Sequence, residues 1–350
     1  MEPIDLNAPL TRTASAEGKI WNYFGGTAYL GLQTLPEFQE RYIENVLRFG
    51  TAYGASREAN VRFPVYNEVE SLLADWLGHE EALTLSSGYL ASQLVCQTLA
   101  AKGHTTYQVK GAHASLSNGF TEKLSLDFET LREKLNKEET DALPPVVMLD
   151  SIDFRGLHYP SFSELAKLPL DRLILVVDDS HGFGVIGEDG IGSSHALRKL
   201  EPTELIVCGS LNKGLATQAG VVLASSKRIS DLKKNPIYSS ASPASPASLQ
   251  TLLETVALRR TQFEKLQENL AVFERGTVGI SWLHRNQGHP AYTCDCEGIS
   301  RYLEELDTLI TSFEYPAHSG HTINRIILSA DHQANDIERL CRLLNEFVSR

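Results

Sequence analysis

Short apolar runs that end in reactive polar side chains are the feature that most constrains the fold of this chain. One run, 173–177, leads directly into Asp178 and His181, and a second run, 205–208, is followed by Lys213. Runs of this length and composition are typical of buried strands in a parallel sheet, whose carboxyl ends collect functional groups. We therefore expect these three side chains to lie close together at one edge of a sheet.

Other segments extend the pattern of alternating strands and helices. Residues 65–77, 88–101 and 335–349 have apolar residues at helical spacing, and Gly78 stands where a helix would stop. The alternation predicts an α/β fold with a mostly parallel sheet flanked by helices. The further predicted strands are 82–85, 146–149, 221–224 and 322–329.

Length and composition favour two domains. The chain has 350 residues, of which 42% are apolar and 22% charged, enough for one large core and one smaller core. After Pro236 the sequence changes to a stretch rich in Ser, Pro and Ala, which is either a linker or an ordered segment, and then to one long helix predicted over about 247–275. We place the division here. The predicted parts are an N-terminal arm over 1–45, a large domain over 46–236 and a small domain over 237–350.

Charge and composition exclude several classes of protein. A formal net charge of −12 argues against nucleic-acid binding, because such proteins carry basic surfaces. No apolar run reaches the roughly 20 residues that a membrane helix needs, and the first residues lack a basic and apolar leader. The five cysteines have no zinc-site spacing and lie mostly in apolar segments, so we expect reduced thiols and no metal. The sequence therefore predicts a soluble, cytoplasmic protein.

One glycine-rich segment matches a dinucleotide-binding motif in its letters but not in its setting. Residues 182–187 match the pattern G-x-G-x-x-G and follow a predicted strand. In a dinucleotide-binding turn the first glycine stands directly at the strand end and a helix follows, whereas here Asp178 to His181 intervene and more glycines come next. These glycines indicate a loop.

The combination of Asp178 and Lys213 suits pyridoxal 5′-phosphate (PLP). A lysine amine carries this cofactor as a Schiff base, and a carboxylate beside the pyridine nitrogen keeps that nitrogen protonated, so that the ring acts as an electron sink. Ser210 precedes Lys213 by three residues, which suits a hydroxyl and an amine that converge on a phosphorylated cofactor. Asp178 or Lys213 alone would more often be a loop or surface residue. Their positions after two apolar runs strengthen the expectation that both bind the cofactor.

Two further motifs fit the same cofactor. Ser87, Gly88 and Tyr89 join a predicted strand to a helix, whose N-terminal amides and dipole would favour a phosphate. An ordinary serine N-cap is the alternative interpretation. His113 supplies a flat imidazole that could stack on a pyridine ring, although a single histidine is more often structural.

Together these motifs resemble the α-oxoamine synthases, which are PLP enzymes of fold-type I, the aspartate aminotransferase-like fold. The strongest match is the segment 177–190, which follows the family pattern V-D-D-A-H-G-x-G-V-x-G-x-x-G almost residue for residue. Tyr29-Leu-Gly-Leu32, Tyr53-Gly-Ala-Ser-Arg57 and His113-Ala-Ser115 are similar to other family motifs, and the match spans roughly residues 21–345. The resemblance implies a large domain with a mostly parallel sheet and a smaller C-terminal α+β domain.

The resemblance also implies roles for individual residues. Lys213 would carry the Schiff base, Asp178 would pair with the pyridine nitrogen, and His181 would approach the ring 3-oxygen. Arg325 would bind the carboxylate of an amino-acid substrate, a bidentate task that suits a guanidinium group. The implied catalytic set is His113, Asp178, His181 and Lys213. The implied phosphate and ring contacts are Ser87, Gly88, Tyr89, His113, Ser210 and, from the partner subunit of a homodimer with shared active sites, Ser240.

The reaction implied by the resemblance is an acyl transfer. An amino acid, alanine or glycine, would condense with an acyl-CoA or acyl-carrier-protein thioester and lose carbon dioxide. Among the family, the 8-amino-7-oxononanoate synthases of biotin biosynthesis are the branch that this expectation follows.

Several positions depart from the family pattern. Phe154 stands where a serine is expected near the ring, Thr27 replaces an asparagine, and Tyr66 replaces a histidine. Parts of the N-terminal arm and of the small domain are also shorter than in the family. These departures leave open another PLP reaction, of the aminotransferase or aldolase type, and a non-catalytic homologue.

Overall fold

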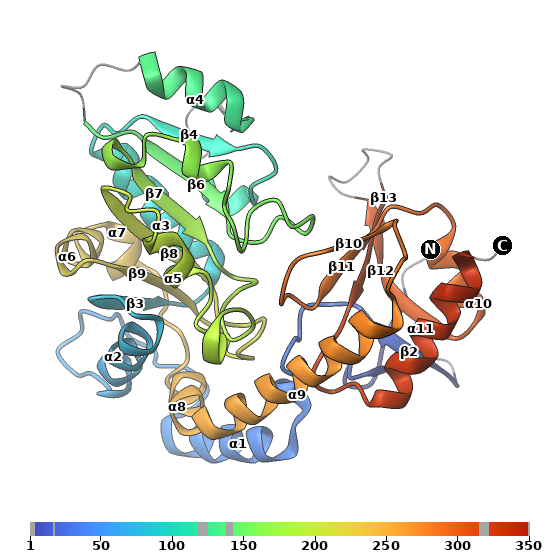
Figure 1. Cartoon of the computed structure of the whole chain (residues 1–350). Helices are drawn as coiled ribbons and strands as arrows, with labels where there is room; N and C mark the ends of the chain where they lie inside the picture. Colours follow the sequence, from blue (N-terminus) through green and yellow to red (C-terminus); the bar gives the residue numbers. More distant parts are fainter. Residues whose placement is uncertain (1–3, 17, 118–124, 138–142, 315–321, 349–350) are drawn as a thin grey trace.

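Two β-sheets organise the chain into two lobes (Figure 1). The structure is a computed structural model that describes residues 4–16, 18–117, 125–137, 143–314 and 322–348. Helices α1 (Pro36–Phe49), α8 (Pro246–Glu254) and α9 (Val256–Gly276) lie below both lobes in the view of Figure 1, and α9 leads from the larger sheet to the smaller one.

The larger sheet is mostly parallel, as the sequence predicted. Its central strands, β6, β7 and β8, are parallel and in register, so that Asp150, Asp178 and Cys208 lie side by side where these strands end. β9 is antiparallel to both of its neighbours. In spatial order the strands are β3 (Glu81–Leu85), β9 (Gly220–Ala224), β8 (Glu204–Ser210), β7 (Ile174–Asp178), β6 (Val146–Asp150), β4 (Thr106–Val109) and β5 (Ser125–Leu126).

Apolar side chains fill both faces of this sheet. Val176 and Ile206 point into a core beneath α3 (Gly88–Ala101), whereas Val177 and Val207 point into the opposite core beneath α2 (Val65–Leu77). Strands that are buried on both faces are continuous apolar runs rather than alternating ones, which is why these strands could be recognised in the sequence. The remaining helices of this lobe are α4 (Phe128–Lys137), α5 (Ser194–Arg198), α6 (Ser226–Lys233) and α7 (Pro236–Ser240).

The smaller sheet combines both ends of the chain. β2 pairs in parallel with β12, so Asn22 lies opposite Thr308. Helices α9, α10 (Ile299–Glu305) and α11 (Ala334–Val348) contribute to its core, for example through Phe273, Leu303 and Leu344. In spatial order the strands are β1 (Thr13–Ala16), β2 (Lys19–Phe24), β12 (Thr308–Glu314), β13 (Thr322–Ile327), β11 (Ala291–Cys294) and β10 (Leu283–Arg285).

The predicted helices at 65–77 and 88–101 are confirmed with the same bounds, and the helix predicted at 335–349 begins one residue earlier as α11. The single long helix predicted over about 247–275 is wrong. Two helices occupy this region, and they are separated at Thr255, which has a non-helical ψ of 22°. The Thr255 hydroxyl donates to the carbonyl of Thr251, a side-chain bond that competes with regular helix geometry.

The division into domains stays a prediction, and the packing favours a later position for it than Pro236. Tyr238 packs in one core of the larger sheet, and Ala244, Leu249 and Leu252 pack in the other. The Ser/Pro/Ala stretch is therefore an ordered part of the larger lobe, and the smaller lobe begins along α9.

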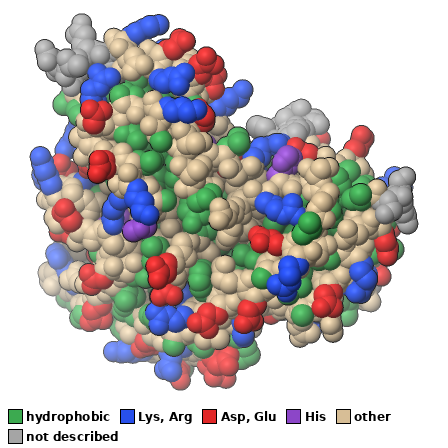
Figure 2. Space-filling model, viewed as in Figure 1, with side chains coloured by type: hydrophobic (Ala, Val, Ile, Leu, Met, Phe, Trp, Pro, Cys, Tyr) green, Lys and Arg blue, Asp and Glu red, His purple; other side chains and the backbone are tan. Residues whose placement is uncertain are grey.

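The surface shows no concentration of one charge on the face in Figure 2, where acidic and basic side chains are interspersed. The same view shows a notch between the two lobes at its upper edge. Within the described part of the chain, no helix is both long and apolar enough to cross a membrane.

Candidate functional site

Asp178 is the last residue of β7 and lies at the edge where the central strands end. Its side chain is 7% exposed, and its Oδ1 accepts a hydrogen bond from the backbone N–H of Ser180 at 2.9 Å. The hydroxyl groups of Ser92 and Ser115 donate to Oδ2 at 3.4 and 3.3 Å. The Asp178 carboxyl group thus accepts hydrogen bonds from one backbone N–H group and two serine hydroxyl groups.

Lys213 follows β8, the neighbouring strand, and its amine lies within the same edge. Lys213 Nζ is 2.8 Å from His181 Nε2. Burial lowers the pKa of Lys213 below its usual 10.5, while Asp178 and Asp150 oppose this shift by stabilising the ammonium form. The structure thus brings together Asp178, His181 and Lys213, the three side chains that the sequence predicted to meet at one edge of the sheet.

His181 connects Lys213 to Tyr29, a residue that the sequence did not single out for the site. His181 Nδ1 is 2.7 Å from the Tyr29 hydroxyl oxygen, and the Tyr29 side chain is fully buried whereas His181 is half-buried. Burial and the nearby cation of Lys213 lower the pKa of His181 well below 6.5, so its ring is neutral. A neutral imidazole has one donor and one acceptor nitrogen. When Lys213 donates to Nε2, Nδ1 must therefore donate to Tyr29, and when Lys213 is a neutral acceptor the two roles reverse.

His113 lies at the opposite side of Asp178 and is exposed. Its backbone N–H donates to Asp150 Oδ2 at 2.9 Å, and its Nδ1 is 2.8 Å from the Ser115 hydroxyl. Asp150, at the end of β6, was not foreseen as a site residue. Burial and the neighbouring charge of Asp178 raise the pKa of Asp150 well above 3.8.

The start of α3 lies against the end of β8. Ser87 is the N-cap, and its hydroxyl accepts a hydrogen bond from the Leu90 N–H at 3.2 Å. A Cβ added at Gly88 would lie 2.5 Å from the Ser210 nitrogen, so only glycine allows this approach. The first amides of a helix have no partner within it, and those of Gly88 and Tyr89 belong to this helix start. Tyr89 has an exposed side chain.

Ser240 lies at the exposed end of α7, in a different part of this chain from the strand ends. Its neighbour Ser239 accepts a hydrogen bond at its carbonyl from the Ser56 hydroxyl. The structure of one chain does not bring Ser240 into the group around Lys213.

Arg325 comes from β13 of the smaller sheet and reaches the same region. Its guanidinium carbon lies 3.7 Å from the centre of the Phe154 ring, and that ring lies 4.7 Å, edge-on, from the His181 ring. His289, fully buried, lies beside them and donates through Nε2 to the His181 carbonyl at 3.1 Å. His289 is a second residue that the sequence did not reveal, because no motif surrounds it.

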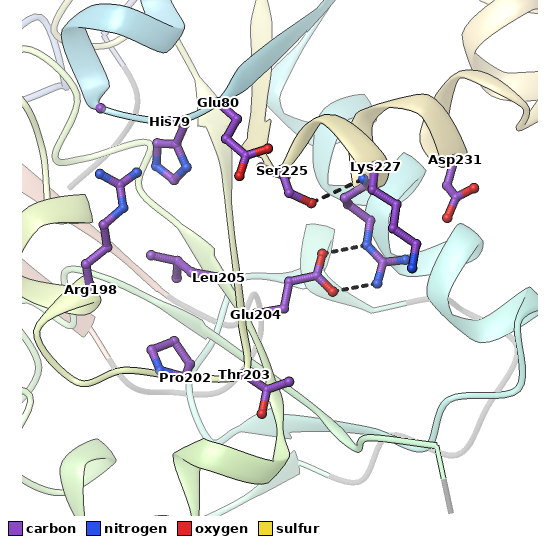
Figure 3. Close-up of a pocket in the computed structure, with 13 residues that line it drawn as sticks. His79, Glu80, Arg198, Pro202, Thr203, Glu204, Leu205, Ser225, Lys227 and Asp231 are labelled. Atoms are coloured by element: carbon purple, nitrogen blue, oxygen red, sulfur yellow. Dashed lines mark hydrogen bonds and ion pairs between the residues drawn. The ribbon is translucent and has the colours of Figure 1, made fainter.

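A separate cavity lies away from Lys213. It has a volume of about 590 Å³ and is formed by the start of α6, the end of α2 and the segment before β8. Figure 3 shows Glu204 and Ser225 among the residues that line it. Glu204 accepts two hydrogen bonds from the Arg228 guanidinium group, at 2.8 and 2.6 Å, and the Ser225 hydroxyl caps α6.

The chain is similar in sequence to known proteins. An 8-amino-7-oxononanoate synthase of Cellvibrio japonicus is 28% identical over 367 residues, which cover 98% of this chain and 91% of that protein. The chain is thus similar to 8-amino-7-oxononanoate synthases along nearly its whole length. The family resemblance predicted from the motifs is therefore confirmed, although no protein-family model matches the chain.

Solved structures of α-oxoamine synthases share the fold, which confirms the predicted fold-type I architecture. A serine palmitoyltransferase of Sphingomonas wittichii superposes with a TM-score of 0.84 at 19% identity, covering 98% of this chain and 91% of that chain. A serine palmitoyltransferase of S. paucimobilis that was solved with PLP and myriocin superposes with a TM-score of 0.82 at 20% identity, covering 98% and 92%.

Proposed function

We propose that this chain binds PLP where β7 and β8 end and that Lys213 carries the cofactor. The observation that carries the proposal is the position of Lys213 Nζ, 2.8 Å from His181 Nε2 and within the field of the Asp178 carboxylate. A lysine amine that can carry PLP and a carboxylate that can pair with its pyridine nitrogen thus lie at one sheet edge. The relatives' structures with PLP support the same assignment.

The residues present fit the cofactor. The glycine at position 88 lets α3 begin directly against Ser210, which leaves helix N-terminal amides and two serine hydroxyls for a phosphate. Asp178, held by three donors, would pair with a protonated pyridine nitrogen, and His113 lies beside it for stacking. Bound PLP would supply an electron sink for negative charge on the α-carbon of an amino acid.

The side chains around Lys213 would hold and move a proton. The lowered pKa of Lys213 favours a neutral amine, which can accept a proton from the α-carbon of a bound amino acid. His181 and Tyr29 would orient that amine through the hydrogen-bonded chain described above. Arg325 would hold the substrate carboxylate through the edge of its guanidinium group.

The reaction we propose is the condensation of an amino acid, alanine or glycine, with an acyl-CoA or acyl-carrier-protein thioester. A carbon–carbon bond forms between the α-carbon and the acyl carbon, and the products are an α-aminoketone, carbon dioxide and the free thiol. The relatives' name supports 8-amino-7-oxononanoate synthesis, with alanine and a biotin-pathway thioester as substrates.

A homodimer with shared sites is part of the proposal. α1 has only two buried residues, Phe38 and Asn45, while Ile43 and Leu47 are 58% and 83% exposed. Large apolar side chains one helical turn apart are typical of an interface between subunits. A second copy would cover this face, and Ser240 of that copy would contact the cofactor phosphate.

Lys213→Ala tests the proposal. Incubation with PLP followed by borohydride reduction is expected to attach PLP covalently to the wild-type chain at Lys213, as read by peptide mass spectrometry, and to leave Lys213→Ala unlabelled. Lys227→Ala, an exposed lysine of α6, is the matched control and is expected to be labelled like the wild type. Covalent labelling of Lys213→Ala at another lysine would contradict the assignment.

A second candidate is another PLP reaction on the same fold, and the altered segment around Phe154 motivates it. The two reactions are separated by their products, because the condensation releases thiol from acyl-CoA, whereas transamination gives a keto acid and retro-aldol cleavage gives an aldehyde. A chain that fails to bind PLP at all would instead be a non-catalytic homologue.

A further inference from the structure

The loop that follows β6 links the two sheets across the candidate site. At its start the Ser151 N–H donates to the Asp178 carbonyl at 2.9 Å. Further on, the Phe154 carbonyl accepts a hydrogen bond from the Thr293 hydroxyl of β11 at 2.6 Å, and Arg155 forms an ion pair with Asp295 at 2.9 Å. The loop is thus fixed both to the edge that holds Asp178 and to the smaller sheet.

Phe154 and Arg325 meet at this link because of the register of the smaller sheet. Thr293 and Arg325 lie directly opposite each other on β11 and β13. Thr293 hydrogen-bonds to the backbone of Phe154 and Arg325 packs on its ring, so two cross-strand neighbours contact Phe154. These two contacts explain why Phe154 keeps a φ of 61°, a conformation that costs energy for a residue with a side chain.

The stacked ring constrains how Arg325 can act. A guanidinium group has two faces and an edge, and it binds a carboxylate through two parallel N–H bonds at the edge. The Arg325 guanidinium carbon lies 3.7 Å from the centre of the Phe154 ring. The same ring is in edge contact with His181, so it connects Arg325 to the Lys213 side of the site.

We propose that Phe154 is a positioning residue that orients Arg325 for the carboxylate of an α-amino acid, an inference that rests on the proposed function. The ring contributes to substrate binding by orienting Arg325, and it makes no contribution through the amine of the substrate. Loss of the ring therefore weakens ligands that carry a carboxylate and spares otherwise identical ligands that lack one.

The test is a binding titration of the PLP-loaded protein, read by the change in its visible absorption, with L-alanine against ethylamine and glycine against methylamine. Phe154→Leu keeps apolar volume but removes the ring, and we expect the dissociation constants of the two amino acids to rise roughly tenfold. Those of the two amines are expected to change less than about twofold. Phe154→Tyr retains the ring and is expected to bind amino acids like the wild type.

Two further variants separate this role from a structural one. Arg155→Ala removes the other link of the loop without touching Arg325 and is expected to leave all four dissociation constants unchanged. In an Arg325→Lys background, Phe154→Leu is expected to have less than about a twofold further effect, because contacting residues are not additive. PLP loading and thermal unfolding are measured for each variant to check folding.

The outcomes are distinguishable. Equal weakening of amino acids and amines by Phe154→Leu would assign the ring a steric role and overturn the inference, as would no effect on either. A PLP-loaded wild type whose visible absorption does not change when L-alanine or glycine is added would overturn the inference as well. A wild-type chain that does not load PLP would instead refute the proposed function.

Discussion

Lys213 has a pKa that is set by two opposing effects, and this balance can be measured. Burial lowers its pKa, whereas Asp178 and, to a smaller extent, Asp150 raise it. The group is a cation when protonated, so burial favours the neutral amine and a nearby negative charge favours the ammonium. Only the neutral amine can attack the aldehyde of PLP.

We therefore predict that covalent loading of PLP onto the apoprotein speeds up as pH rises, with a midpoint below 10.5. Asp178→Asn removes the larger of the two charges that stabilise the ammonium, so it is expected to shift the midpoint to lower pH by more than Asp150→Asn does. The measurement is the rate of appearance of the visible absorption band over a pH series. A midpoint at or above that of ordinary lysine, or a shift upward in Asp178→Asn, would contradict this account.

At the scale of residues, the sequence predicted the site residues that follow strands, the family resemblance added Arg325 from the smaller sheet, and Tyr29 and His289 were missed. Asp178, His181 and Lys213 were found because each follows a recognisable apolar run. Tyr29 and His289 reach His181 through tertiary contacts over more than 100 positions, which no local pattern encodes. The signal for Asp150 was its place at the end of a predicted strand, beside Asp178 in register.

At the scale of elements, the contact between α3 and β8 depends on the absence of a side chain at one position. A Cβ at Gly88 would meet the backbone nitrogen, Cα and Cβ of Ser210 at 2.5 to 2.6 Å, and none of these atoms can move without moving the strand end. The helix start and the strand end are thus packed as one rigid unit beside Lys213.

Gly88→Ala is accordingly predicted to lower the free energy of unfolding by about 1–3 kcal/mol, as overpacking does, and to reduce PLP affinity at least tenfold. Urea unfolding and PLP titration measure the two effects. Gln97→Ala, in the same helix but away from Ser210, is the control and is expected to change neither. Normal PLP affinity in Gly88→Ala would show that the helix start is not part of the phosphate site.

Helices were predictable where an apolar stripe and a stop signal coincide, as in α2 with its Gly78 cap. The break between α8 and α9 was not, because Thr255 is only a weak helix breaker and acts here through a specific hydroxyl bond. The central parallel strands β6, β7 and β8 were predictable because they are continuous apolar runs. β1 and β2 were not, since both mix buried and exposed positions and β2 pairs with the distant β12.

At the scale of the whole molecule, the exposed face of α1 defines the predicted subunit interface. Leu47→Glu places a charge where a second copy would bury an apolar side chain, which costs several kcal/mol unless the charge is paired. We predict that Leu47→Glu is monomeric by sedimentation at concentrations where the wild type is dimeric, with an unchanged far-UV spectrum.

The control for this prediction is Lys134→Glu, a charge reversal on exposed α4, which is expected to leave the dimer intact. The proposed shared site adds a second expectation, because a monomeric variant would lack the partner's Ser240 and bind PLP less tightly. A wild-type chain that sediments as a monomer would contradict the interface directly.

The pairing of β2 with β12 has a consequence for how the chain is made. Nearly the whole polypeptide must leave the ribosome before Asn22 can meet Thr308, whereas the strands of the larger sheet follow one another closely. Contacts so distant along the chain form slowly, and an unpaired strand is exposed to association with other chains until they do. The first strands to be synthesised are therefore among the last to complete their native pairing. Until translation ends, β2 must remain without its partner β12 and must avoid pairing with other strands.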